Sequence, residues 1–191
     1  MTFSAVLAGT PGPSNTLLTA IGARSGIRGG LTSLLGQVCG MGAMLFVITL
    51  GPGYLLLAHP AVLQVLKWGS VTLLCWVAWH IATAPPATAP ARTPTGFLAL
   101  AGFQLVNPKG WLTAIAAVAT MLSRRGGTAL GQATLFAAVF TLVALVSCFP
   151  WLAAGGAIRR YLRTPRALRI FNVAAGGLLA ASAILLGWTR V

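Results

Sequence analysis

Long apolar runs separated by short polar segments dominate the sequence. Six of them are long enough to cross a bilayer: about 2–22, 31–58, 61–83, 96–122, 129–154 and 170–188. The first and the fourth are interrupted by proline and glycine. Because roughly 20 apolar residues span the hydrocarbon core as a helix, this pattern predicts an all-α membrane bundle of about six transmembrane helices, two of them broken.

The two interruptions have similar chemistry. The first runs from Thr10 to Asn15 (TPGPSN) and the second from Asn107 to Gly110 (NPKG), so each combines proline and glycine with a polar amide. Proline removes a backbone N–H and disfavours α-geometry in the residue before it. Each of these segments is therefore expected to end one helical piece and start another.

The chain divides into two halves that resemble each other. The proline-rich segment 84–95 is expected to be a loop between residues 1–83 and 96–191. A run from Arg28 to Gln37 follows the first broken segment, and a similar run from Arg125 to Gln132 follows the second. Three crossings per half would place the two copies in opposite orientations, which predicts two inverted three-helix repeats within one transmembrane domain.

Composition supports the membrane assignment and limits the chemistry. The 191 residues are 57% hydrophobic and 7% charged, whereas soluble domains carry roughly 25% charged residues. The chain has 13 Lys and Arg but no Asp or Glu. Most charge-relay and hard-metal mechanisms need a carboxylate, and no phosphate-binding loop motif occurs, so we expect neither an enzyme nor a cofactor or metal site.

The basic residues lie between the apolar runs. This placement favours anchoring to anionic lipid headgroups over binding to nucleic acid. The first, third and fifth connections hold eight arginines, against three on the other side. The positive-inside rule then places the arginine-rich side in the cytoplasm and both termini outside, as expected for a multi-pass protein of the cell (inner) membrane.

Small residues and cysteines within the spans are expected to serve packing. Gly22, Gly26 and Gly30 recur every four residues, and so do Gly36 and Gly40, a spacing that lets helices approach closely. The three cysteines, at positions 39, 75 and 148, are expected to be small buried apolar residues.

The two breaks predict a substrate site in the membrane interior. Unpaired backbone groups at membrane depth are tolerated where they line a cavity or are buried in protein. A half-helix N-terminus suits an anionic group, and free carbonyls suit an ammonium, so a zwitterion would satisfy both. The candidate substrate-binding residues are Pro11, Gly12, Pro13, Ser14, Asn15, Gln37, Asn107, Pro108 and Lys109.

Simpler roles for the same residues stay open. Asn15 or Asn107 could make an interhelical hydrogen bond instead of contacting a ligand. Lys109 could pair with a substrate carboxylate or extend to the membrane interface. The prolines could kink the helices for packing alone.

The same motifs resemble the LysE/RhtB family of bacterial amino-acid exporters. The resemblance rests on Thr10 to Asn15, Arg28 to Gly36, Leu66 to Gly69, and Asn107 to Lys109, which together extend over essentially the whole chain. The stretches 76–85 and 102–107 are similar to the branch that exports cysteine and O-acetylserine. The sequence departs from the family in lacking acidic loop residues, in starting its first segment late, and at 70–72, where SVT replaces a run of small residues and tyrosine.

This resemblance implies a secondary-active, proton-coupled efflux permease for amino acids or related small zwitterions. The implied partners are an amino-acid-like substrate and the lipid bilayer, with no nucleic acid; a homo-oligomer stays open. An alternative is a structural or partner-binding membrane protein without transport activity, in which the glycines pack against another chain. A third, an enzyme using cysteine and histidine, is disfavoured because Cys75 and His80 would point to different faces of one helix.

Overall fold

Helices are the only regular secondary structure in the described part of the chain. The computed structural model describes residues 12–51, 59–84, 95–105, 107, 110–111, 114, 128–162 and 164–188. These residues form five helices: α2 (Pro13–Thr49), α4 (Pro60–Ala82), α5 (Phe97–Leu105), α7 (Ala129–Ile158) and α8 (Pro165–Trp188). All except α5 are long and apolar enough to cross a membrane.

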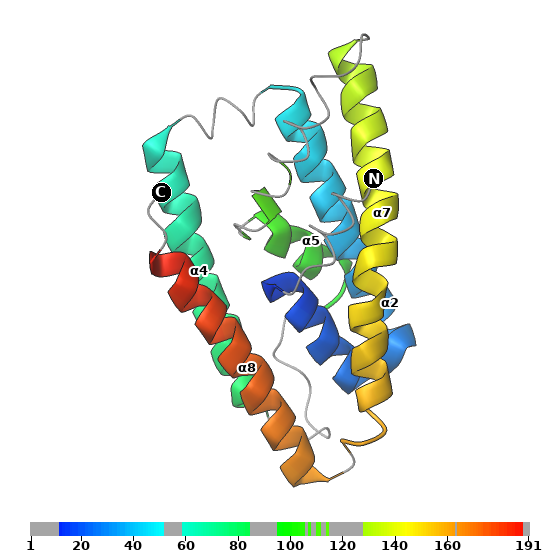
Figure 1. The fold of residues 1–191 in the computed structure, drawn as a ribbon, viewed down its shortest axis with the longest axis vertical. Helices are drawn as coiled ribbons and strands as arrows, with labels where there is room; N and C mark the ends of the chain where they lie inside the picture. The colour runs from blue at the N-terminus through cyan, green and yellow to red at the C-terminus, as the bar shows by residue number, and fades with distance from the viewer. Residues whose placement is uncertain are drawn as a thin grey trace.

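Helix α2 is two helical pieces, residues 13–25 and 27–49, joined by a kink at Gly26. This glycine has φ 74° and ψ 178°, a backbone conformation open to a residue without Cβ. A straight helix would separate Asn15 and Gln37 by about 33 Å. Instead, the Gln37 Nε2 donates a hydrogen bond to the Asn15 Oδ1 at 3.1 Å, so the chain must fold back at Gly26 (Figure 1).

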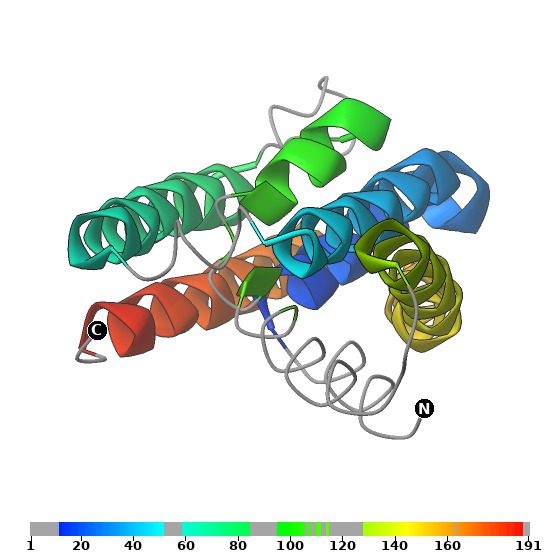
Figure 2. The ribbon, with the colours of Figure 1, turned by 90° about the horizontal axis from the view of Figure 1, so that it is seen from above.

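The helices are arranged as two antiparallel pairs (Figures 1 and 2). In the first pair, Gly30 of α2 lies against Leu152 of α7, whereas Gly42 lies against Thr141. In the second pair, the end of α4 lies beside the start of α8, so Gly176 packs against Ala78. Helix α5 packs on the second part of α2.

The close packing predicted for the glycines is confirmed at several positions. A Cβ at Gly22 would meet the carbonyl oxygen of Leu152 in α7, and one at Gly36 would meet the carbonyl oxygen of Phe97 in α5. Gly40 likewise leaves no room for a side chain beside Ala101. The backbones of neighbouring helices therefore touch at these glycines.

Two apolar clusters lie on either side of the first part of α2. Leu18 belongs to the cluster formed with the second part of α2 and with α7. Leu17 and Ile21 belong to the cluster formed with α4, α5 and α8. The segment that follows the proline break is thus at the centre of the bundle.

Most predicted helix limits within the described residues are confirmed, with four differences. The second predicted span runs to 58, but α2 ends at Thr49, and Gly51, which has φ 101° and precedes Pro52, does not continue the helix. Residues 24–30 were expected to form a connection, but α2 stays helical on both sides of Gly26, because one glycine suffices for the reversal. Helix α8 begins at Pro165 instead of 170, since the Thr164 Oγ1 caps it by accepting from the Ala167 N–H at 3.1 Å. Helix α7 extends to Ile158 instead of 154. Segments 52–58 and 85–94 and most of 106–127 lie outside the described residues, and so does most of the predicted fourth span beyond Leu105.

Candidate functional site

The first part of α2 begins inside the protein. Gly12 precedes it in extended geometry, and Pro13 occupies its first turn, where its missing N–H costs no helical hydrogen bond. Gly12, at the N-cap position, has no side chain with which to cap this helix start. Ser14 and Asn15 follow directly and are 8% and 3% exposed. The predicted break thus places a helix N-terminus and two polar side chains in the core.

Ser14 makes hydrogen bonds to two amide side chains at and after the end of α5. The Asn107 Nδ2 donates to the Ser14 Oγ at 2.6 Å and to the Gln104 Oε1 at 3.3 Å. The Gln104 Nε2 donates to the same serine oxygen at 3.3 Å. Gln104 is fully buried and Asn107 is 4% exposed. The two interrupted segments of the sequence therefore meet through Ser14 and Asn107.

Asn15, the next residue, takes part in a second set of hydrogen bonds, which includes Gln37. The Gln37 Nε2 donates to the Asn15 Oδ1 at 3.1 Å and to the Cys148 Sγ of α7 at 3.4 Å. Gln37 is 1% exposed, and its buried Oε1 has no hydrogen-bond partner among the described residues. An unpaired buried acceptor is costly, and a ligand that donates a hydrogen bond would remove that cost.

These five side chains, Ser14, Asn15, Gln37, Gln104 and Asn107, are called the polar cluster below. Four of them were predicted from the sequence. Gln104 was missed, although it precedes Asn107 by three residues and so lies near it at a helix end. Pro11, Pro108 and Lys109 lie outside the described residues.

One prediction about the cysteines is wrong. Cys39 and Cys75 are exposed on the surface of the bundle instead of being buried, and Cys148 alone of the three is buried. Its thiol sulfur also accepts the hydrogen bond from Gln37, so Cys148 has a polar contact in addition to its packing. Apolar runs alone do not show which helical face is turned inward.

The polar cluster is neutral but rich in donors and acceptors. Four amides and a hydroxyl converge with the start of α2, whose dipole presents a partial positive charge. Such a group in a membrane interior is expensive unless it is internally paired or serves a ligand. The arrangement can hydrogen-bond a small polar molecule without supplying a formal charge.

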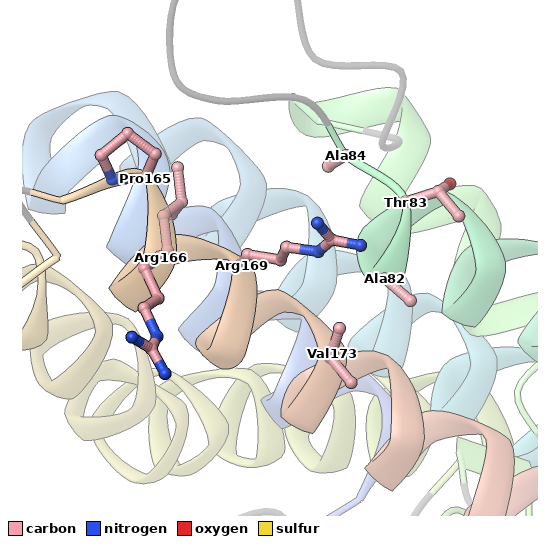
Figure 3. Close-up of a pocket in the computed structure, with 8 residues that line it drawn as sticks. Ala82, Thr83, Ala84, Pro165, Arg166, Arg169 and Val173 are labelled. Carbon is pink, nitrogen blue, oxygen red and sulfur yellow. The ribbon is translucent and has the colours of Figure 1, made fainter.

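Cations gather at one end of the bundle. A Cβ placed on Gly26 would lie 2.9 Å from the Arg159 Nη1, so the kink of α2 and the end of α7 share this end. An open cavity of about 600 Å³, called the outer cavity, lies there between the end of α4 and the start of α8. Figure 3 shows that Arg169 extends toward Thr83 at the end of α4, whereas Arg166 points away from it.

Comparison with known proteins places these observations in a family context. The family model described as LysE type translocator matches residues 5–189. Proteins named cysteine/O-acetylserine efflux protein from Salmonella choleraesuis and Salmonella typhimurium are each 33% identical over 123 residues, and one from Klebsiella pneumoniae is 32% identical over 123 residues. The Salmonella matches cover 63% of this chain, and all three cover 63% of the relative's length, less than two thirds. No solved structure matches the chain significantly.

Proposed function

This chain belongs to the LysE type translocator family, and we propose that it exports amino acids or closely related zwitterionic metabolites across the inner membrane. The names of its relatives make cysteine and O-acetylserine the first candidates. The observation that carries the proposal is the polar cluster, in which the two interrupted segments meet inside an otherwise apolar bundle. A purely structural membrane protein gains little from such a group.

The polar cluster is proposed to bind the substrate at both ends of its zwitterion. The unpaired Gln37 Oε1 would accept a hydrogen bond from the ammonium group. The start of α2, where the N-cap residue Gly12 offers no capping side chain, would face the carboxylate through its dipole and its backbone N–H groups. Ser14 and Asn107 would then orient the polar side chain of the substrate.

Transport is proposed to use two inverted halves that rock around this site. In an inverted repeat, corresponding helices run in opposite directions. The second part of α2 and α7 hold corresponding places in the two halves, as do α4 and α8, and each pair is antiparallel. This arrangement supports the proposal that residues 1–83 and 96–191 are the two copies.

Export is also proposed to be driven by the proton gradient. The chain offers no carboxylate as a proton carrier, and its two histidines are outside the polar cluster. His59 precedes α4, and the His80 Nδ1 lies 2.8 Å from the carbonyl oxygen of Trp76. A histidine, a lysine or the substrate itself would therefore carry the proton.

The test is substrate flux in proteoliposomes containing the purified protein. Wild-type protein should move cysteine or O-acetylserine faster than empty vesicles, and collapsing the pH gradient should slow this flux. Asn107→Ala removes two hydrogen bonds of the polar cluster and should lower flux about five- to tenfold. Thr134→Ala, which removes an exposed hydroxyl bonded only to its own helix, is the matched control and should transport normally. Wild-type vesicles that move no amino acid would favour the structural alternative.

A further inference from the structure

A second polar site lies outside the polar cluster. Asn172 of α8 is 2% exposed, and its buried Nδ2 has no hydrogen-bond partner in the part of the chain that the structure describes. It lines a small enclosed cavity of about 10 Å³, called the inner cavity, together with Arg24, Leu17, Ala20, Ile21 and Ile81. A cavity of this size holds about one water-sized group.

Both polar groups of the inner cavity are hydrogen-bond donors. The guanidinium of Arg24 has only donors, and the unpaired atom of Asn172 is the donor nitrogen of its amide. The chain contains no Asp or Glu at any position, so no acidic side chain can neutralise Arg24. The end of the first part of α2 contributes about half an elementary negative charge, which is less than the full charge of the arginine. The inner cavity therefore suits an acceptor that brings its own negative charge.

The inner cavity lies between the outer cavity and the polar cluster. Ser14, Leu17, Ile21 and Arg24 recur every three or four residues and so share one face of α2. Ser14 belongs to the polar cluster, and the other three line the inner cavity, ending about 15 Å further along the helix.

On its other side, the inner cavity adjoins the outer cavity. Ile81 lines the inner cavity and Ala82 lines the outer one. On α8, Asn172 lines the inner cavity, whereas Leu168, Arg169 and Val173 line the outer one. The two cavities are thus lined by neighbouring residues of the same two helices.

We propose that Arg24 and Asn172 form an anion subsite that receives the carboxylate of the exported zwitterion on its way from the arginine-lined outer cavity to the polar cluster. The inner cavity has room for one carboxylate oxygen but not for a whole amino acid, as expected of a subsite. This inference rests on the proposed function, because it assumes that the substrate crosses this bundle.

The transport test separates the carboxylate from the rest of the substrate. Arg24→Gln and Asn172→Leu should each raise the KM for cysteine about tenfold or more, since a hydrogen bond to a charged group is worth roughly 1.5–3 kcal/mol. Flux of cysteinamide, in which a neutral amide replaces the carboxylate, should be the same in these variants as in wild type. Arg28→Gln is the matched control, because it removes an exposed arginine of the same helix that lines neither cavity.

Two transport results would overturn the subsite. One is an equal KM change in Arg24→Gln and Arg28→Gln, which would assign the effect to general surface charge. The other is an equal loss of cysteine and cysteinamide flux in Arg24→Gln. If wild-type protein moves neither compound, the proposed function fails, and the subsite is then judged by anion binding alone.

Anion binding is measured on the purified full chain without transport. At constant ionic strength, replacing chloride by acetate should raise the melting temperature of wild type but not of Arg24→Gln. Asn172→Asp supplies an internal carboxylate beside Arg24 and should keep the fold while abolishing the acetate effect. A wild-type melting temperature that does not respond to acetate, or an acetate response that persists in Asn172→Asp, would refute the subsite.

Discussion

The two antiparallel helix pairs are held together in different ways. Between α2 and α7 the backbones touch on both sides: Gly22 meets the carbonyl of Leu152, and Gly155 meets the carbonyl of Thr19. Hydrogen bonds also cross this contact, including one from the Thr19 Oγ1 to the carbonyl oxygen of Trp151 at 3.2 Å. Between α4 and α8 the backbones also approach at Gly176, where a Cβ would lie 2.7 Å from the carbonyl oxygen of Ala78, but the rest of the packing is through apolar side chains such as Leu74 and Leu179.

This difference indicates a division of labour within the bundle. In the first pair, α2 carries three of the five side chains of the polar cluster, and backbone contacts and hydrogen bonds with α7 fix its register. The α4 and α8 pair has a contact that is mainly apolar away from Gly176, its side chains can repack, and both cavities lie along it. We therefore expect changes between α2 and α7 to affect folding most, and changes between α4 and α8 to affect it less.

The largest effect is expected from a side chain added between α2 and α7. In Gly155→Ala the new Cβ would meet the Thr19 carbonyl oxygen and lie 2.9 Å from the backbone nitrogen of Ala23. Overpacking of this kind costs about 1–3 kcal/mol, so the melting temperature of the purified protein should fall clearly. Gly177→Ala on α8 is the control, since its Cβ has no neighbour within 4 Å. Equal melting temperatures would show that the backbone contact is not needed.

A second experiment separates substrate binding from stability within the polar cluster. Gln37→Leu removes the hydrogen bonds to Asn15 and Cys148 but also removes the buried Oε1 that has no partner among the described residues, so the melting temperature should change little. Flux should nevertheless fall about tenfold, because the acceptor proposed for the ammonium group is lost.

Ser33→Ala is the matched control for this experiment. The Ser33 Oγ is buried and accepts a hydrogen bond from the Gly96 N–H at 2.8 Å, away from the polar cluster. Its loss should cost about 1 kcal/mol of stability while flux per folded molecule is retained. If Gln37→Leu unfolds the protein while transport per folded molecule is normal, Gln37 has a packing role instead.

A third experiment asks whether the polar cluster opens to water. Cys148 is fully buried and contacts Gln37. With Cys39→Ser and Cys75→Ser as background, a water-soluble thiol reagent should modify Cys148 slowly in active vesicles, and saturating substrate should slow the reaction further. Modification at a rate that ignores substrate, or no modification during active transport, would place the route elsewhere.

Features that depend on local chemistry could be predicted from the sequence, whereas features that depend on how helices pack could not. Spans and breaks could be predicted because hydropathy and proline act locally. The partners Gln104 and Cys148 could not, because each contact depends on how one helix is rotated against another. The helices have apolar residues on most of their surface, so periodicity does not mark the inward face. The segment in which α2 reverses contains several glycines. Only the packing against α7 shows that the reversal occurs at Gly26.

The smallest change in stability is expected from the loss of a helix cap. Each helix pair contains a threonine cap of the same chemistry. The Thr128 Oγ1 accepts from the Gly131 N–H at 3.2 Å at the start of α7, and the Thr164 Oγ1 does the same for the Ala167 N–H at 3.1 Å at the start of α8. Replacing either threonine by alanine costs about 1 kcal/mol of local helix stability.

The two pairs should respond differently to this equal loss. Helix α7 is held along its length by backbone contacts with α2, so Thr128→Ala should fray one turn and barely lower the melting temperature. Helix α8 lacks such contacts near its start, so Thr164→Ala should lower the melting temperature more and speed amide hydrogen exchange in the first turns of α8. A larger fall in melting temperature for Thr128→Ala than for Thr164→Ala would contradict the proposed division of labour. The α2 and α7 pair would then depend on the capped end of α7 and not on the contacts along the helix.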